Sequence, residues 1–299
     1  MTGATQQRQL PIGDEIFLDH IAHFVPDVEA ATRALVRVGF APTPVSVQVN
    51  PDPAGGAPQL TGTGNVTAMF ANGYIEVLFK TADTPLVAEM EAAMARYPGV
   101  HLAALAVADA AGAHARLANN AFRVRPLVAM QRPVDTGAAP GTARFTLARV
   151  EAGEMPEGRI QMLTHHTQHL VWQPRWLSHS NGALALMRLL IVVADLDEAA
   201  GRYARFTGRS AARAPFGYAI ELDRGRLDLT TADGFRQLLP EISIPCLPFM
   251  AAYEIKVRSL AALADLLKHA AVKFWQRADG LVAPFPQELG QGAWLFTQM

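Results

Sequence analysis

The chain has 299 residues, of which half are apolar and 18% are charged, and its formal net charge is −1. This length is typical of about two domains, and the apolar fraction predicts a large buried core and excludes a disordered chain. The near-zero charge argues against sequence-independent binding to nucleic acid or to an anionic membrane, because both need clustered lysine and arginine.

The cysteine count and the apolar runs indicate a compartment. The only cysteine, Cys246, cannot form an intramolecular disulfide, which favours a reducing environment. No apolar run approaches the roughly 20 residues of a membrane span, and residues 1–16 lack the pattern of a signal peptide. We therefore expect a cytoplasmic protein with neither a nucleic-acid nor a membrane partner. The glycine-rich stretch 61–64 lacks a following Lys-Ser/Thr, so no nucleotide cofactor is expected.

The first predicted elements run from residue 18 to residue 79. Alternation predicts a strand over 18–25, and Asp27 is a suitable N-cap for a helix over 28–38 that ends at Gly39. A long loop rich in proline and glycine follows. Two further strands, 65–70 and 74–79, are separated by Asn72-Gly73, a strong hairpin signal. With a short strand after the helix, the predicted order is β-α-β-β-β.

The same pattern recurs three more times along the chain. Each copy has an apolar strand end, a capping residue two positions later and a helix rich in alanine and leucine. The four copies lie at 23–40, 105–122, 191–208 and 255–272. Further strands are predicted at 145–150, 159–164, 218–222, 226–230, 281–283 and 293–297, and joining helices at 85–97 and 233–239. The repeats predict an α+β fold of mainly antiparallel sheets with helices outside.

These modules resemble the vicinal oxygen chelate superfamily, which includes glyoxalase I, extradiol dioxygenases and bleomycin-resistance proteins, and within it the glyoxalase-like domain proteins. Four stretches carry the resemblance: LDHI running into VPD (18–27), TGTGN (61–65), GYIEVL (73–78) and HHTQHLVWQPRWLSHSNGA (165–183). It implies four βαβββ modules in two paired-module, half-barrel-like units around a ligand cleft. The expected glyoxalase-like domain is 17–182, with modules 18–79 and 100–166 plus a bridging segment. The expected second half is 183–299, with modules 184–230 and 250–298.

The resemblance implies metal ligands on the first and fourth strands of a module, which are His20 and Glu76 here. An imidazole and a carboxylate suit a divalent Fe, Mn, Ni, Co or Zn ion. The other modules do not supply a second pair of this kind, since their corresponding positions hold Leu102 and Gln161, Arg188 and Asp228, and Ala252 with an apolar residue near Leu295. The alternative is a hydrogen-bonded His20–Glu76 pair in a wet cleft.

Other candidate residues follow from chemistry and position. Glu76 is a candidate base where no metal binds it, and His165 or His166 are candidate proton shuttles. The spacing of His165 and His169 also permits a helical zinc site, which we consider the weakest interpretation. The predicted substrate-binding residues are Asn65, Gln161, Trp172, His179 and Asn181.

Two functions of different classes follow. The first is an enzyme acting on a small oxygenated organic molecule, with one divalent metal as a possible cofactor and lyase, isomerase or dioxygenase chemistry. The second is a metal-free protein of bleomycin-resistance type that binds and sequesters a small molecule. A homodimer is a possible assembly, with the second half burying a dimer or inter-domain surface.

Overall fold

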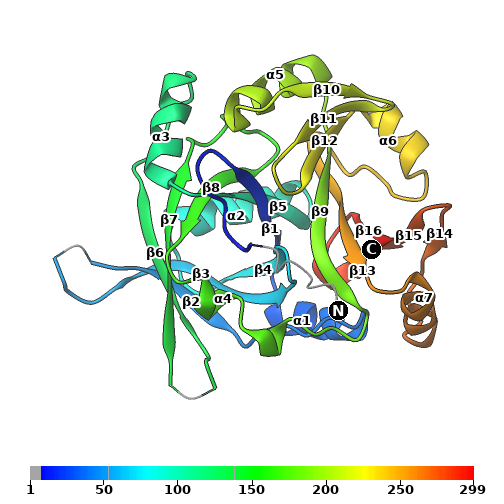
Figure 1. The fold of residues 1–299 in the computed structure, drawn as a ribbon, viewed down its shortest axis with the longest axis horizontal. Helices are drawn as coiled ribbons and strands as arrows, with labels where there is room; N and C mark the ends of the chain where they lie inside the picture. Colours follow the sequence, from blue (N-terminus) through cyan, green and yellow to red (C-terminus); the bar gives the residue numbers. More distant parts are fainter. Residues whose placement is uncertain (1–7, 53, 138) are drawn as a thin grey trace, which may run out of the picture.

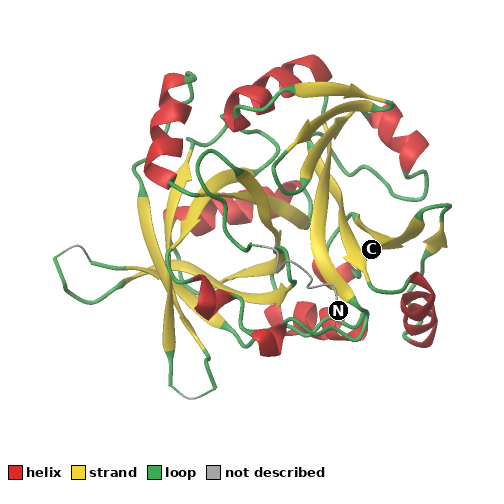
Figure 2. Ribbon diagram, viewed as in Figure 1, coloured by secondary structure: helices red, strands yellow, loops and turns green. Residues whose placement is uncertain are grey.

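The computed structural model describes residues 8–52, 54–137 and 139–299. In this part of the chain, seven α-helices surround two eight-stranded sheets, and one of the sheets closes into a barrel (Figures 1 and 2). The predicted α+β class is therefore confirmed. The division into four βαβββ modules stays an interpretation, with which the order of elements agrees.

The barrel is built from the first half of the chain, in the order β1-β4-β3-β2-β6-β7-β8-β5. A half-barrel was expected, and this expectation is wrong for the first sheet, because β2 and β6 meet and close it. That seam is thin, since Val49 and Gln131 form its only ladder pair in the described residues. The strands are β1 (Ile16–Phe24), β2 (Ser46–Asn50), β3 (Gln59–Met69), β4 (Tyr74–Lys80), β5 (Gly99–Val107), β6 (Val128–Val134), β7 (Gly141–Arg149) and β8 (Arg159–His165).

The second sheet is open, with β10 and β14 at its two edges and β9 and β13 at its centre. Within each half, the first and last strands of each predicted module pair in parallel, and the central pair of strands is antiparallel. The strands are β9 (Ala183–Val192), β10 (Ala211–Ala214), β11 (Gly217–Glu221), β12 (Arg226–Thr230), β13 (Phe249–Val257), β14 (Trp275–Gln276), β15 (Gly280–Pro284) and β16 (Ala293–Gln298).

The helices begin where the sequence predicts. Asp27, Asp109, Asp195 and Ser259 each accept a backbone N–H of the first turn, which stabilises each helix by about 1 kcal/mol. The helices are α1 (Val28–Arg37), α2 (Pro85–Arg96), α3 (Ala110–Asn119), α4 (Gln168–Val171), α5 (Leu196–Thr207), α6 (Ala232–Leu238) and α7 (Leu260–His269), with 3-10 turns η1 (Pro174–Trp176) and η2 (Gln287–Leu289). None of the described helices has the length and apolar character needed to cross a membrane.

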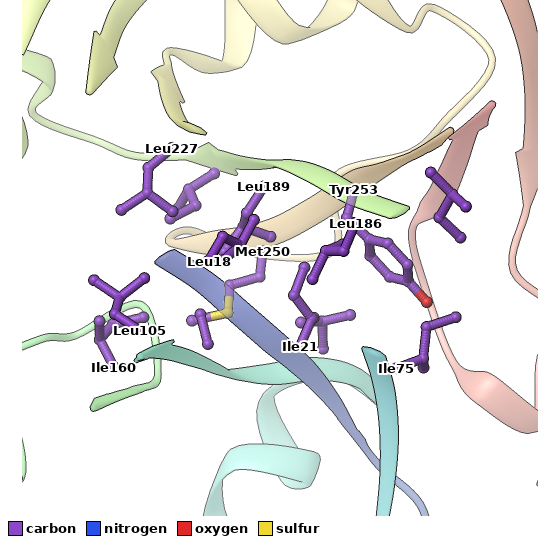
Figure 3. Close-up of a cluster of buried hydrophobic side chains, with 14 of the residues drawn as sticks. Leu18, Ile21, Ile75, Leu105, Ile160, Leu186, Leu189, Leu227, Met250 and Tyr253 are labelled. Atoms are coloured by element: carbon purple, nitrogen blue, oxygen red, sulfur yellow. The ribbon is translucent and has the colours of Figure 1, made fainter. Parts of the chain in front are cut away.

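The main core lies between the barrel and the second sheet (Figure 3). Leu18 and Ile21 of β1 point toward Leu186, Leu189 and other side chains of the second sheet, and all four are fully buried. Each such leucine or isoleucine stabilises the fold by about 1.5–3 kcal/mol. The opposite face of β1 points into the barrel, so this one strand links the packing core to the barrel interior.

Candidate small-molecule site in the barrel

A β-bulge in β1 brings two polar side chains to the barrel interior. Strict alternation would place Asp19 and His20 on opposite faces, but the register against β5 shifts between Leu18 and His20. The Asp19 carboxylate therefore accepts hydrogen bonds from His20 Nδ1 at 2.7 Å and from His165 Nε2 at 3.0 Å. All three side chains are at least nine-tenths buried.

Electrostatics keep Asp19 ionised. Burial alone would raise the pKa of this carboxyl, but the charge and hydrogen bond of His165, together with those of His20, hold the pKa well below its ordinary value. Since an ionised Asp19 only accepts, it fixes the tautomers of both histidines. His20 therefore turns its Nε2 toward Glu76, and His165 Nδ1 is left buried with no hydrogen-bond partner among the described residues.

Glu76 projects from β4 into the same space. Its Oε2 lies 3.5 Å from His20 Nε2, and its Oε1 accepts hydrogen bonds from the side-chain amides of Asn65 and Gln48. Thr63 in turn donates to Gln48 Oε1 at 2.6 Å, which orients that amide. The predicted pairing of His20, Glu76 and Asn65 is thus what the structure brings together. One oxygen of Glu76 is held by amides, and the other faces the imidazole.

Aromatic rings hold the histidines in place. Tyr74 stacks on His20, with ring centroids 4.4 Å apart, and Trp172 packs on His165 at 4.8 Å. Burial and the carboxylates of Asp19 and Glu76 raise the pKa of Tyr74 well above its ordinary value, so its hydroxyl stays protonated. Trp172 thus supports a site residue and is absent from the cavity wall, where it was predicted to contact substrate.

A cavity of about 30 Å³ adjoins the His20–Glu76 pair. This volume is room for about one water molecule. Three arginines line it together with His20 and Glu76: Arg132 from β6, Arg149 from β7 and Arg159 from β8. Arg132 also lines an outer groove of about 360 Å³ beside the β2–β6 seam. Arg149 and Arg159 line a second groove of about 350 Å³ near α2. The arginines therefore stand between the interior and both outer grooves.

Three predicted site residues lie elsewhere. His166 lies just past the end of β8, is exposed, and bonds through its ring to the Thr146 hydroxyl at 2.8 Å. His179 donates to the Met69 carbonyl and accepts the Ala41 N–H, and Asn181 donates to the Val38 carbonyl. These two side chains attach the bridging segment to the barrel, and neither is among the residues that line the cavity beside His20 and Glu76. The helical zinc interpretation fails, because His165 lies in β8 and α4 begins at Gln168.

The donors in the barrel do not make up a metal site of the kind that the resemblance implies. Leu102 stands where a second histidine would be needed, and the Gln161 oxygen accepts a hydrogen bond from Arg149 Nε at 2.8 Å. Nowhere in the described residues do three or more His, Cys, Asp or Glu side chains gather in a way that would hold a metal ion. The three arginines also disfavour a dication electrostatically. The predicted divalent metal stays a prediction.

The second sheet uses its corresponding positions differently. Arg188 on β9 lies 3.2 Å from Asp228 of β12 and 2.9 Å from Glu254 of β13. Arg226 adds a further contact to Asp228. The two arginines and the two carboxylates neutralise one another. The sheet that carries them is open. This face therefore offers an internally paired charge network in place of a site with free donors.

Sequence reasoning missed several site residues. Asp19 was overlooked because alternation assigned it to the other face, and a bulge leaves no mark in a single sequence. Arg132 and Gln48 were missed because strand 128–134 was not predicted and the closing seam could not be foreseen. Arg149 and Arg159 lie in the predicted strands 145–150 and 159–164, but they were not recognised as site residues. The sequence did carry a signal for Arg159, because it lies two residues before Gln161 and therefore on the same face of the predicted strand.

Comparisons with known proteins identify a family for this chain. The family model described as "Glyoxalase-like domain" matches residues 18–207. The chain therefore belongs to the glyoxalase-like domain family. No curated protein sequence matches it significantly.

Solved structures show the same fold at low identity. A hypothetical protein from Staphylococcus aureus has a TM-score of 0.63 and 10% identity, covering 95% of this chain and 99% of the other. A mutant of 4-hydroxymandelate synthase from Streptomyces coelicolor has a TM-score of 0.58 and 13% identity, covering 95% and 92%. A Mn(II)-bound glyoxalase from Novosphingobium aromaticivorans has a TM-score of 0.54 and 11% identity, covering 95% and 82%.

Proposed function

We propose that the barrel interior binds a small oxygenated organic molecule and moves a proton on it, with Glu76 and His20 as the exchanging groups. The observation that carries the proposal is the buried His20–Glu76 pair, with 3.5 Å between Nε2 and Oε2 and with Asp19 fixing the imidazole. A carboxylate and an imidazole placed in this way form a general base and general acid pair.

The proton balance of this chemistry is simple. Glu76 takes a proton from a carbon next to a carbonyl, and the pair of electrons passes to the carbonyl oxygen. That proton passes from the Glu76 carboxyl to His20 Nε2, and His20 returns it to the oxygen or to the neighbouring carbon, so the net change is an isomerisation without redox. Asn65 and Gln48 keep one Glu76 oxygen oriented throughout. Asp19 stabilises the imidazolium that forms when His20 carries a second proton.

NMR in D2O tests this proposal by measuring the replacement of carbon-bound protons by deuterons. The test compounds are a panel of small hydroxyketones and oxo acids. We expect the wild type to catalyse exchange on at least one class. Glu76→Gln should remove it, because the amide is no base and keeps the size of the side chain. His166→Gln is the matched control, since His166 is exposed and bonds only to Thr146. Wild-type protein without exchange on any compound, or undiminished exchange by Glu76→Gln, contradicts the proposal.

One observation favours a metal-assisted second candidate. A carboxylate on Nδ1 that frees Nε2 is also the arrangement that orients a metal-ligating histidine. His20 and Glu76 alone would hold such an ion, which is fewer protein ligands than the resemblance implies, and the ion would supply Lewis-acid polarisation of a bound oxygen. Metal analysis of protein purified without chelator decides: one equivalent of transition metal that is lost in His20→Ala supports this candidate. If neither the wild type nor His20→Ala carries metal, the metal-assisted candidate fails and the metal-free proton transfer stands as the proposal.

The predicted binding protein remains the rival. It requires ligand binding without proton exchange. Tight binding of a panel compound, with carbon-bound protons that exchange no faster than in buffer, would favour sequestration over catalysis.

A further inference from the structure

The barrel interior carries more positive charge than its own carboxylates neutralise. Three guanidiniums line the cavity, whereas Glu76 is the only carboxylate in its wall. Asp19 lies behind it and is already bonded to two histidines. Among the described residues, none of the three arginines forms an ion pair within 4.0 Å. An interior with uncompensated cations is costly unless something else neutralises them.

Arg132 is the clearest case. It is 6% exposed, yet its guanidinium makes no hydrogen bond and no ion pair with any described residue. Burial lowers the pKa of Arg132, and the neighbouring Tyr74 and Glu76 act in the opposite direction. Arg132 lines the cavity and the seam groove, and its five N–H donors have no acceptor among the described residues.

The other two arginines keep most of their donors free. Arg149 uses only Nε, which donates to Gln161, so its two terminal nitrogens have no bond to the described residues. Arg159 makes one long bond of 3.4 Å to the Leu86 carbonyl, and its guanidinium lies 5.4 Å from the centre of the Phe24 ring. Burial lowers the pKa of Arg149 to about 9 and that of Arg159 to about 10, so both remain charged near neutral pH.

A buried arginine elsewhere in the chain shows the contrast. Arg202 is 7% exposed, and its terminal nitrogens bond to both oxygens of Glu157 at 2.7 and 2.8 Å. Its Nε donates to Glu198 at 2.8 Å. Arg202 thus has two carboxylate partners. The barrel arginines lack them.

We propose that the ligand of the barrel is a small organic carboxylate, whose anionic group is held by Arg132 together with Arg149 and Arg159. This inference rests on the proposed function for the placement of the ligand beside His20 and Glu76, and it adds the charge class. Arginine forks match the two oxygens of a carboxylate, and such charge-assisted bonds are among the strongest available. The cavity is small, so the carboxylate enters it and the remainder of the ligand lies in an outer groove.

The test measures binding by calorimetry with lactate, pyruvate and succinate, with lactamide and pyruvamide as neutral counterparts. Inorganic phosphate serves as a tetrahedral anion. We expect at least one carboxylate to bind, its amide to bind at least about tenfold more weakly, and phosphate to bind more weakly as well. No binding by any carboxylate, or equal binding of acid and amide, overturns the inference. Tighter binding of phosphate assigns the arginines to a phosphate and overturns it too.

Two variants localise the charge. Arg132→Gln should weaken carboxylate binding by about tenfold or more, because one fork of donors is lost. Arg144→Gln is the matched control, since Arg144 is an exposed arginine on the same barrel and its loss changes the net charge equally. Equal loss in the two variants would show a general charge effect and overturn the inference. Arg149→Gln, with near-native circular dichroism, gives an independent result should Arg132→Gln fail to fold.

The proton-transfer proposal and the carboxylate site can fail independently, and the experiments tell the two failures apart. Carboxylate binding that persists in Glu76→Gln, with no proton exchange in the wild type, leaves the anion site standing and removes the proton-transfer proposal. Proton exchange on neutral hydroxyketones, with no binding of any carboxylate, leaves the proton-transfer proposal standing and removes the anion site.

Discussion

The arginines inside the barrel and two arginines of the second half, Arg188 and Arg202, are paired in opposite ways. Arg188 of β9 and Arg202 of α5 are each bound by two carboxylates, and the second sheet is open. In the barrel, Arg132 has no partner among the described residues, and the sheet closes around it. The comparison teaches that one half uses its charges to hold the structure together. The other keeps them available inside a cavity, which is the arrangement expected where a ligand completes the pairing.

The largest predicted effect tests the structural side of this comparison. Arg202→Met should lower the free energy of unfolding by about 3–5 kcal/mol, because it leaves Glu157, which is 1% exposed, as an uncompensated buried anion. Urea denaturation measures the change. Arg205→Met on the exposed side of the same helix should cost under about 0.5 kcal/mol. A loss of less than about 1 kcal/mol in Arg202→Met would remove the distinction between the two kinds of arginine.

The junction between the halves should be sensitive to acid. Burial lowers the pKa of His23 from 6.5 to about 4, while its ring bonds to the Leu289 carbonyl and the Tyr253 hydroxyl. As the pH falls, the unfolded chain protonates this histidine near pH 6.5, whereas the folded chain does so only near pH 4. The free energy of unfolding therefore decreases between these pH values, by about 3 kcal/mol for His23. His101 has a similarly lowered pKa of about 4 and adds to the slope.

Unfolding free energy measured between pH 7 and pH 4 checks this expectation. His23→Gln should remove about half of the loss, because His101 still titrates. His269→Gln, at an exposed histidine, should leave the slope unchanged. An unaltered slope in His23→Gln would show that the junction does not control acid stability.

A smaller effect is expected at the centre of the barrel. Asp19→Asn should lower the free energy of unfolding by about 2 kcal/mol at pH 7, because two buried charge-assisted hydrogen bonds are weakened. The folded pKa of Asp19 is depressed, so its stabilisation is present above the ordinary value of 3.8 and is lost as the pH falls below it. The difference between wild type and variant should therefore narrow below about pH 4. A constant difference down to pH 3 would contradict the assigned ionisation.

The sequence predicted the repeated elements better than the site. Helix caps such as Asp27 and Asp195 are local signals, and the family resemblance selected His20 and Glu76, whose side chains the structure brings within 3.5 Å. The site depends on long-range features that no local pattern carries. The bulge at Asp19 is set by the register of β1 against β5, and the closure of the barrel depends on contacts between β2 and β6. His179 and Asn181 were predicted to bind substrate because a turn rich in polar side chains resembles a site, and the hydrogen bonds of both side chains anchor the bridging segment to the barrel.

The smallest predicted effect on stability is the most informative about the barrel. Arg132→Met should leave the free energy of unfolding of the ligand-free protein unchanged or raise it by up to about 1 kcal/mol. The methionine keeps the apolar part of the side chain and removes a buried cation that no described residue neutralises. The same substitution should abolish carboxylate binding, so stability and binding separate at this position. Destabilisation of Arg132→Met by as much as Arg202→Met, in the same urea titration, would mean that Arg132 supports the fold and that both halves use their charges alike.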